Sequence, residues 1–296
     1  MNEHTWTEIE RAVAASSPGF RIEQRTSVGG GCINPAWCIV GRGGRYFVKT
    51  NDAARAAMFE AEAAGLTELG RARAVRVPQP ICYGADAEAT WLVLEHIDLH
   101  SRKGESDAVL GAQLAQLHRC TGNRYGWFRD NTIGSTPQHN EQADGWPAFW
   151  REKRLGVQLA LARGNGHTAK LQAEGERLLD ALPQFFTTYR PAPSLLHGDL
   201  WSGNAAADEH GRPVIFDPAI YYGDREADIA MTELFDGYSL SFYAAYRDAY
   251  PLDAGYAVRK DLYNLYHVLN HLNLFGRGYL RQAEAMIGRL LAEIRR

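Results

Sequence analysis

Short runs of β-branched and aromatic residues, separated by glycine and polar positions, dominate the first hundred residues of the chain. This pattern is typical of strands, and it predicts strands over residues 21–28, 37–40, 45–49 and 91–94. The glycine-rich stretch 41–44 between two of these runs predicts a hairpin. A single helix is expected among them, over residues 53–69, because Met58, Leu66 and Leu69 recur at spacings of eight and three.

Beyond residue 98 the pattern changes to long amphipathic stretches. The clearest has apolar residues at steps of three and four, namely Val258, Leu262, Leu265, Leu269, Leu272 and Phe275. Segment 194–217 interrupts this helical region with β-rich residues. The sequence therefore predicts an α+β fold with two parts, a small β-rich N-terminal lobe over residues 1–97 and a larger helical C-terminal lobe over residues 98–296.

Composition excludes several classes of protein. The chain has 296 residues, of which 45% are hydrophobic, so it can bury a substantial core. Its formal net charge of -3 gives no bulk attraction to nucleic acid or to anionic membranes. A small basic group, Arg71, Arg73 and Arg76, is interpreted as part of a solvated loop. Neither a nucleic-acid partner nor a membrane partner is expected.

The location of the protein is also inferred from composition. The most continuous apolar stretch, residues 91–94, is far shorter than the roughly 20 residues that a bilayer requires. The first ten residues contain three glutamates and lack the apolar segment of a secretory signal. Four cysteines without a Cys-x-x-Cys pair indicate no disulfide framework. We expect a cytoplasmic protein, either a monomer or a homodimer.

The residues that could perform chemistry lie in the β-rich segment 194–217. Asp199 is followed by Asn204, and Asp217 comes after an apolar run. If residues 205–207 pair with residues 214–216 so that Ala207 faces Val214, then Asn204 faces Asp217, with a register uncertain by one residue. Such oxygen ligands suit Mg²⁺ bound to substrate phosphates. The alternative is a polar loop beside an ordinary hairpin. No further His or Cys lies at the spacing of a zinc site.

These residues resemble a known family. Asp199, Asn204 and Asp217 are similar to the catalytic loop and metal-binding aspartate of the protein-kinase-like fold. The strings HGDLWSGN and DPAIYYGDREADIAM resemble the fructosamine-3-kinase, or ketosamine kinase, family, within the branch that includes aminoglycoside phosphotransferases. The resemblance implies a bilobal kinase-like fold that uses ATP and Mg²⁺. In that pattern Asp199 receives the proton of the acceptor hydroxyl, while Asn204 and Asp217 hold the metal.

Two further residues fit an ATP site. Lys49 ends a predicted strand, where a lysine within a β-rich lobe either points to water or meets an anion. Glu62 shares the apolar stripe of the following helix, whereas Glu60 points away from it, so Glu62 is the expected partner of Lys49. In kinases such a pair orients the lysine toward the α- and β-phosphates.

The remaining expected ATP contacts are a glycine-rich segment and the boundary between the lobes. Gly29, Gly30, Gly31 and Cys32 lie between two strands, where backbone amides can approach phosphates, although a plain turn is an alternative. Cys32 is either a redox-sensitive thiol or a small apolar residue. Glu95 and Ile97 lie at the predicted boundary between the lobes. By analogy with kinases, the backbone at this boundary is expected to lie beside the adenine.

The resemblance further suggests acceptor-binding residues. Trp201 offers a flat apolar face to a sugar, or else packs against the lobe. His271 lies in a stretch similar to the family's Asn-His…Phe-Gly…Tyr pattern, and it either lines the acceptor pocket or packs in the core. Two departures from the family pattern, Asp224 in place of a common His and Leu272 in place of a common Trp, could alter that pocket.

The functional hypothesis is an enzyme, an ATP:ketosamine 3-phosphotransferase. Its acceptors would be fructosamine, ribulosamine or erythrulosamine adducts of lysine, as glycated lysine residues of proteins or as small ketosamines, and phosphorylation would promote deglycation. One alternative is a kinase of another small acceptor such as an aminoglycoside, choline or a sugar. A second is a catalytically silent nucleotide-binding protein, although Lys49, Asp199, Asn204 and Asp217 are all present.

Overall fold

The computed structural model describes residues 1–29 and 34–294. Contacts within the chain divide it into two compact units. The N-terminal unit comprises Met1–Ser106 together with Ala205–Pro218, and the C-terminal unit comprises Asp107–Asn204 together with Ala219–Arg296. The lobe boundary expected at residue 97 remains a prediction. The segment 205–218, which follows Asn204 in sequence, belongs by its contacts to the N-terminal unit.

The N-terminal unit is built on a five-stranded antiparallel sheet. Its strands are β1 (Arg21–Val28), β2 (Ala36–Arg42), β3 (Gly44–Asp52), β4 (Pro80–Ala85) and β5 (Ala89–Glu95), in the order β1-β2-β3-β5-β4. Four of these are the strands that the sequence predicts. The sequence analysis missed β4, which begins with Pro80 and contains Gly84. It lies at the edge of the sheet, where a proline at the strand start removes no necessary hydrogen bond.

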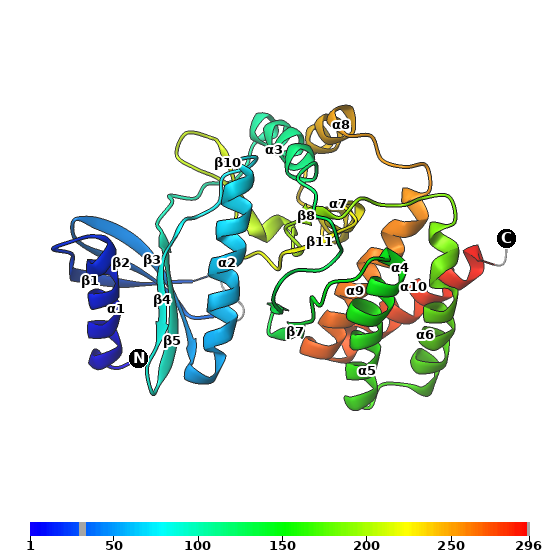
Figure 1. Cartoon of the computed structure of the whole chain (residues 1–296), viewed down its shortest axis with the longest axis horizontal. Helices are drawn as coiled ribbons and strands as arrows, with labels where there is room; N and C mark the ends of the chain where they lie inside the picture. Colours follow the sequence, from blue (N-terminus) through cyan, green and yellow to red (C-terminus); the bar gives the residue numbers. More distant parts are fainter. Residues whose placement is uncertain (30–33, 295–296) are drawn as a thin grey trace. The chain divides into compact units, whose positions relative to one another are not determined.

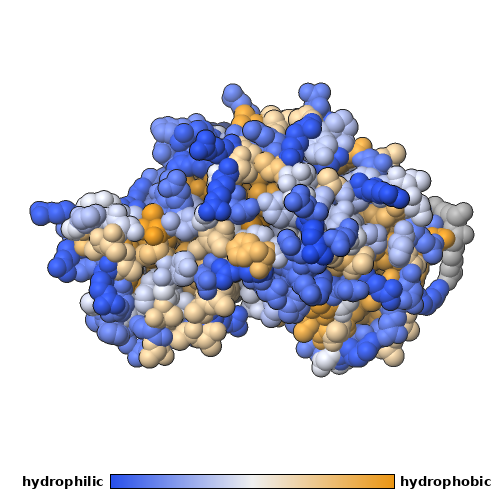
Figure 2. Space-filling model, viewed as in Figure 1, coloured by the Kyte–Doolittle hydropathy of each residue, from blue (hydrophilic) through white to orange (hydrophobic). Residues whose placement is uncertain are grey.

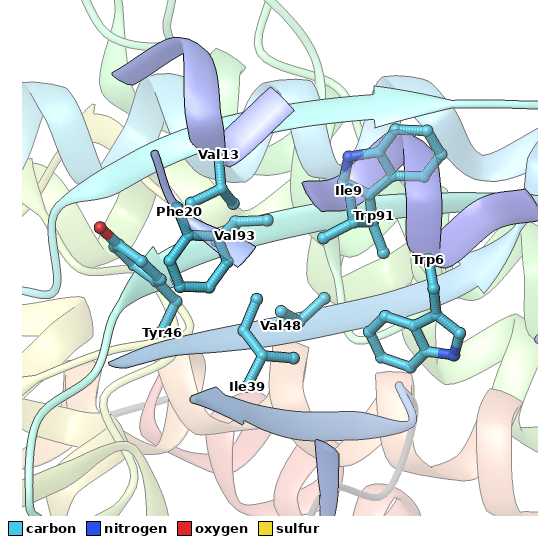
Figure 3. Close-up of a cluster of buried hydrophobic side chains, with 9 residues drawn as sticks. All are labelled: Trp6, Ile9, Val13, Phe20, Ile39, Tyr46, Val48, Trp91 and Val93. Carbon is cyan, nitrogen blue, oxygen red and sulfur yellow. The ribbon is translucent and has the colours of Figure 1, made fainter. Parts of the chain in front are cut away.

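Two helices accompany the sheet, and the expectation of a single helix is therefore wrong. Helix α1 (Glu3–Ser16) begins after Asn2, whose side chain accepts a hydrogen bond from the Thr5 N–H at 2.9 Å. The pattern of the first ten residues predicts only that they are not a secretory signal, and it indicates no helix because the buried face consists of a few residues. Trp6, Ile9 and Val13 nevertheless recur at helical spacing, and they pack on the sheet (Figure 3).

The two helices cover opposite faces of the sheet (Figure 1). Val48 of β3 belongs to the apolar cluster beneath α1. Side chains alternate along a strand, so the next residue, Lys49, points to the other face. That face is covered by α2 (Ala56–Ala72), which follows a 3₁₀ turn at Ala53–Arg55 and extends three residues beyond the predicted helix. Strand alternation thus brings Lys49 to the helix that carries Glu62.

The C-terminal unit is mainly helical. Its central helix is α9 (Tyr256–Phe275), which packs against α5 (Gly156–Gly164), α7 (Glu226–Leu234) and α10 (Leu280–Glu293). The other helices are α3 (Gly104–Leu117), α4 (Trp146–Trp150), α6 (Ala169–Ala181) and α8 (Leu240–Ala249). A π-helical turn, Arg151–Leu155, joins α4 to α5, and 3₁₀ turns lie at Leu182–Phe186, Ser202–Asn204 and Arg277–Tyr279.

Short strands complete the two units. In the C-terminal unit β6 (Asn131–Ile133) pairs with β7 (Thr136–Gln138), and β8 (Ser194–Leu196) pairs with β11 (Tyr221–Gly223). In the N-terminal unit β9 (Ala205–Ala207) pairs with β10 (Pro213–Ile215). Strand β8 leads directly into the loop that carries Asp199, and the β9–β10 hairpin leads to Asp217.

The register of the β9–β10 hairpin differs by one residue from the predicted one. Ala207 faces Pro213 rather than Val214, and the ladder ends at Ala205 and Ile215, so Asn204 and Asp217 are not ladder partners. The connecting turn explains the shift. The Asp208 N–H donates to the Arg212 carbonyl at 2.9 Å, and the Asp208 carboxylate accepts hydrogen bonds from the backbone N–H groups of two turn residues. Aspartate side chains commonly close turns in this way.

The hairpin is fastened to the N-terminal unit by backbone hydrogen bonds. Ala207 exchanges two of them with His100, at 2.8 and 2.9 Å, and the Ile215 N–H donates to the Arg76 carbonyl at 3.0 Å. Arg76 is also paired with Glu95 and with Asp208. The interpretation of Arg76 as part of a solvated loop is therefore wrong, because its guanidinium links strand β5 to the hairpin turn.

The face of the molecule shown in Figure 2 is mainly hydrophilic. Hydrophilic residues cover most of the face shown in Figure 2, and hydrophobic ones form separate small areas. Among the described residues, no helix has the length and apolar character needed to cross a bilayer.

Candidate active site

Lys49 lies at the centre of a buried group of charges in the N-terminal unit. Its side chain is 7% exposed, and its ammonium nitrogen lies 2.6 Å from Glu62 Oε1 and 2.7 Å from Asp217 Oδ1. Burial by itself lowers the pKa of Lys49, but the two carboxylates outweigh this effect and raise the pKa above its ordinary value. Lys49 therefore stays protonated.

Each partner reaches Lys49 from a different element. Glu62 comes from α2, where its neighbours on the helix face, Met58 and Leu66, are buried. This ion pair is the one expected from helical spacing. Burial raises the pKa of Glu62, and the Lys49 ammonium opposes that rise. Asp217 follows β10, has a left-handed backbone with φ of 57°, and keeps 45% of its side chain exposed. Its carboxylate therefore touches both Lys49 and solvent.

The C-terminal unit holds the loop that carries Asp199. The Asp199 N–H donates to His197 Nδ1 at 3.3 Å, and the Asn204 amide nitrogen donates to the Asp199 carbonyl at 2.9 Å. The same amide nitrogen lies 3.3 Å from Asp199 Oδ2. His197 is fully buried, in keeping with a packed loop residue rather than a base. The hydrogen bonds between Asp199 and Asn204 fix the curvature of the loop.

Asp228 of α7 anchors the start of this loop. Its two carboxylate oxygens accept the backbone N–H groups of His197 and Gly198, at 2.7 and 2.8 Å. His118 lies 3.2 Å from the same carboxylate, and its other ring nitrogen lies 2.8 Å from the Tyr246 hydroxyl. Burial opposes ionisation of Asp228, but these hydrogen bonds and nearby imidazoles lower its pKa. Asp228 thus braces the start of the loop through these contacts.

The backbone geometry at position 198 explains why a glycine precedes Asp199. Its φ is +83°, which favours glycine, and a Cβ at this position would lie 2.0 Å from the carbonyl oxygen of Ala219. Any larger residue would push the loop away from the 219–221 segment. The close packing of Gly198 against Ala219 therefore fixes the position of the neighbouring Asp199.

Asn204 and Asp217 have the chemistry of Mg²⁺ ligands. Both offer side-chain oxygens, which Mg²⁺ prefers, and Mg²⁺ commonly takes only one or two protein carboxylate or amide groups beside phosphates and water. The Asn204 nitrogen is engaged by Asp199, which leaves its amide oxygen as the acceptor end of that side chain. Within residues 1–29 and 34–294, no group of three or more His, Cys, Asp or Glu residues could hold a metal ion.

The other residues predicted to contact ATP lie in the N-terminal unit. Gly29 follows β1, with no atom within 4 Å of the position of a Cβ. Gly30, Gly31 and Cys32 lie outside the described residues. The Glu95 N–H donates to the Gln79 carbonyl at 2.8 Å, and its carboxylate pairs with Arg76 at 2.7 Å. Ile97 is half-buried in the segment after β5.

The predicted acceptor residues lie in the C-terminal unit. Trp201 is 38% exposed, and its ring packs over Gly203, where a Cβ would lie 2.1 Å from a ring carbon. His271 is half-buried on α9. Asp224 and Leu272, by contrast, are completely buried. Asp224 accepts hydrogen bonds from the hydroxyls of Tyr189 and Tyr263, so this departure from the family pattern is accommodated inside the helical core.

Sequence reasoning missed the structural contributions of four residues. His118 continues the apolar stripe of α3, one helical turn after Leu114, and that spacing could have indicated its burial. Asp208 and Arg76 are separated by 132 residues, and only the folded chain brings them together. Phe235, which packs on His271, likewise has no local signal in the sequence.

Comparison with known proteins identifies the class and then the family. The chain has the protein-kinase-like fold of small-molecule kinases. The crystal structure of a protein named as a fructosamine-3-kinase from Haemophilus somnus matches it with a TM-score of 0.88 at 29% identity, over 97% of each chain. The family model described as fructosamine kinase matches residues 5–293, and the chain belongs to this family.

Two relatives are similar over nearly the whole chain. A protein of Synechocystis sp. named probable ketoamine kinase is 46% identical over 288 residues, which cover 97% of each chain. A protein of Arabidopsis thaliana named protein-ribulosamine 3-kinase, chloroplastic, is 44% identical over 282 residues, which cover 94% of this chain and 86% of the relative. The fold and family implied by the sequence motifs are thus confirmed.

Proposed function

We propose that this protein is an ATP-dependent kinase that phosphorylates the 3-hydroxyl of ketosamines, the adducts formed when a sugar reacts with a lysine amine. The observation that carries the proposal is its 44–46% identity, along nearly its whole length, to proteins named ketoamine kinase and ribulosamine 3-kinase. The anchored Asp199 loop and the Lys49 charge group supply the chemistry that such a reaction needs.

In the N-terminal unit, Lys49 is the proposed contact to the α- and β-phosphates of ATP. Glu62 and Asp217 hold its ammonium in place and keep it protonated. Backbone amides of the segment Gly29, Gly30, Gly31 and Cys32 are proposed to approach the phosphates. The backbone around Glu95 and Ile97 is proposed to border the adenine.

In the C-terminal unit, Asp199 is proposed to orient the acceptor hydroxyl and accept its proton. The hydroxyl oxygen then forms a bond to the γ-phosphorus, the bond from that phosphorus to the β,γ-bridging oxygen breaks, and ADP leaves. Asn204 and Asp217 would hold Mg²⁺, which when bound offsets charge on the phosphates. Asn204 also keeps Asp199 in place through its hydrogen bond to the Asp199 carbonyl.

The acceptor is proposed to be a glycated lysine residue or a small ketosamine. Trp201, exposed beside Asp199 in the loop, is proposed to face the sugar ring. The phosphorylated adduct then decomposes and releases the lysine amine, so the reaction promotes deglycation. We place this activity in the cytoplasm and propose a monomer or homodimer.

A phosphorylation assay tests the proposal. Purified protein with ATP and Mg²⁺ is expected to phosphorylate fructosamine, ribulosamine or erythrulosamine adducts of lysine. Asp199→Asn should lower kcat by about 10²–10⁴-fold, since it removes the proton acceptor, while ATP binding is largely retained. The exposed Asp248→Asn of α8 serves as the control. Near-normal turnover by Asp199→Asn, or phosphate transfer to none of the three adducts, would refute the assignment.

A further inference from the structure

The segment 219–221 packs against the start of the Asp199 loop. The Ala219 N–H donates to the His197 carbonyl at 2.9 Å, and a Cβ on Gly198 would lie 2.0 Å from the Ala219 carbonyl oxygen. The segment then enters strand β11, which pairs with β8, the strand that leads into the loop. A shift of this segment would therefore move the start of the loop.

Two side-chain amides hold the segment by its backbone carbonyls. Gln138 Nε2 donates to the Ala219 carbonyl at 3.0 Å, and Asn131 Nδ2 donates to the Ile220 carbonyl at 2.8 Å. Both amides belong to the β6–β7 hairpin, in which Asn131 faces Gln138, and Gln138 Nε2 also donates to Asn131 Oδ1 at 2.8 Å. We call Asn131 and Gln138 the amide clamp. The clamp ties the hairpin to the segment that contacts the loop.

The amide of Gln138 is engaged at both of its polar atoms. The side chain is 1% exposed, and its nitrogen donates to Asn131 and to Ala219. Its oxygen accepts a hydrogen bond from the Tyr266 hydroxyl at 2.8 Å. An amide offers two donors and an acceptor without carrying a charge, which a carboxylate of the same size cannot do. The three contacts thus account for a glutamine at this position.

Tyr266, on α9, lies near both the clamp and Asp199. Burial raises the pKa of Tyr266 to about 12, and the Asp199 carboxylate adds to this rise, although Arg154 opposes it. The hydroxyl therefore keeps its proton and can donate it to Gln138. Since the charge of Asp199 acts on Tyr266, the clamp and the Asp199 carboxylate share one neighbour.

Further buried polar groups support the clamp. Asn131 Oδ1 also accepts from Asn140 Nδ2 at 2.9 Å, and Asn140 Oδ1 accepts from Arg154 Nη2 at 2.7 Å. Asn140 and Arg154 are completely buried, and Arg154 Cζ lies 4.0 Å from the centroid of the Tyr221 ring. The three amides thus have partners at both their nitrogen and their oxygen atoms. Networks of this kind restrict their members to one arrangement.

We propose that Gln138 is a positioning residue for phosphoryl transfer, an inference that rests on the proposed function. Gln138 holds segment 219–221, the segment fixes the start of the loop, and the loop sets the position of Asp199 relative to the acceptor hydroxyl. Because Gln138 is buried, it acts through this backbone and not by contact with ATP or the acceptor. Small displacements of a reacting group are costly in rate.

The first test is a division between kcat and KM. Gln138→Met removes the hydrogen bonds and nearly preserves the side-chain length. In the ketosamine phosphorylation assay it should lower kcat about 10–100-fold, because the proton acceptor is displaced. The KM values for ATP and for the ketosamine should change less than about 2-fold. Asn131→Ala, at a half-buried position, removes the contact to Ile220 and should give the same division with a smaller loss of kcat.

The control is a change that weakens the same unit elsewhere. The Thr168 hydroxyl caps α6 by accepting the Leu171 N–H at 3.1 Å, and it donates to Glu284 of α10 at 2.8 Å. Thr168→Ala should therefore lower the melting temperature while kcat and both KM values stay close to those of the parent protein.

Hydrogen exchange gives a readout that does not depend on activity. Backbone amides of residues 196–200 should exchange about 10-fold faster in Gln138→Met than in the parent protein, and should be unaffected in Thr168→Ala. Unchanged exchange at these amides, or a rise in KM at constant kcat, overturns the inference. If exchange quickens selectively but the parent protein phosphorylates no ketosamine, the clamp stands and the proposed function fails. If the parent protein is active and Gln138→Met retains its kcat, the proposed function stands and the positioning role fails.

Discussion

The two units hold their candidate catalytic groups by different means. In the N-terminal unit, Lys49 is positioned by two carboxylates from separate elements, through long side chains that bear full charges. In the C-terminal unit, the start of the Asp199 loop is positioned by backbone N–H groups bonded to the single carboxylate of Asp228. A charged group can lose one partner and retain the other. A backbone anchored at close range cannot adjust without moving the residue that follows.

This difference suits the two proposed tasks. A lysine that contacts phosphates has to exchange a carboxylate partner for a phosphate oxygen, and Asp217, half of whose side chain is exposed, is the partner placed to allow it. An aspartate that accepts a proton instead has to stay at a fixed position relative to the reacting hydroxyl, since small displacements are costly in rate. Substitutions in the two units should therefore differ in size and in kind.

The largest expected effect compares two glycines with similar backbone angles. Gly198 has φ of +83° and no room for a Cβ, whereas Gly211, in the hairpin turn of the N-terminal unit, has φ of +76° and no atom within 4 Å of a Cβ. Gly211→Ala should cost about 1 kcal/mol of unfolding free energy, because only the backbone angle is unfavourable. Gly198→Ala should cost about 3 kcal/mol and abolish turnover, because the loop must also move.

Urea denaturation of both variants, together with the phosphorylation assay, checks this pair. Similar losses of stability in the two variants, with activity retained in Gly198→Ala, would show that the close approach to Ala219 does not position the Asp199 loop.

An intermediate effect is expected for the charge group. Lys49→Met leaves two carboxylates without their cation, while Glu62→Gln leaves Lys49 still paired with Asp217. Lys49→Met should therefore be the more destabilising change. In the double variant the losses should fall short of additivity by about 1–2 kcal/mol, as expected for a directly contacting pair. The measurement is a double-mutant cycle from chemical denaturation, with Lys103→Met, at an exposed position, as the control. Additive losses would mean that the ion pair contributes nothing to stability.

The smallest effect is a pH dependence in the hairpin turn. Burial opposes the shift, but hydrogen bonds from the backbone of Arg212 and His210 and from the guanidiniums of Arg212 and Arg76 lower the pKa of Asp208 below its ordinary 3.8. An acid with a lowered folded-state pKa stabilises the fold above its unfolded pKa, and this contribution disappears as the pH falls through the folded value. Asp208→Asn should lower the free energy of unfolding by about 1 kcal/mol at pH 7, because the amide oxygen can still accept the backbone hydrogen bonds, and the deficit should shrink below pH about 4.

Urea midpoints between pH 7 and pH 3 would measure this dependence. The neighbouring exposed Glu209→Gln is the matched control. A deficit that stays constant over the whole range would exclude the ionised Asp208 as its source.

The sequence predicted the features that depend on neighbouring residues better than those that depend on residues far apart in the chain. Strand alternation and helical spacing were enough to select Glu62 over Glu60 as the partner of Lys49, because both patterns act over a few residues. The hairpin register was predicted one residue away from its actual value, because the polar atoms of Asp208 and not the hydrophobic pattern determine the turn. Helix α1 was missed because only a few of its residues are buried, and their role is evident only from their packing on the sheet.

The sequence by itself determined the class of protein, the order of the main elements around Lys49 and the loop from Asp199 to Asn204, since each depends on local periodicity or on a contiguous motif. The tertiary structure alone decided that Asp217 meets Lys49, that Asp228 and His118 hold the Asp199 loop, and that Phe235 packs on His271. The physical reason is distance along the chain. Lys49 and Asp217 are 168 residues apart, and a contact of that kind exists only after folding has brought the elements together.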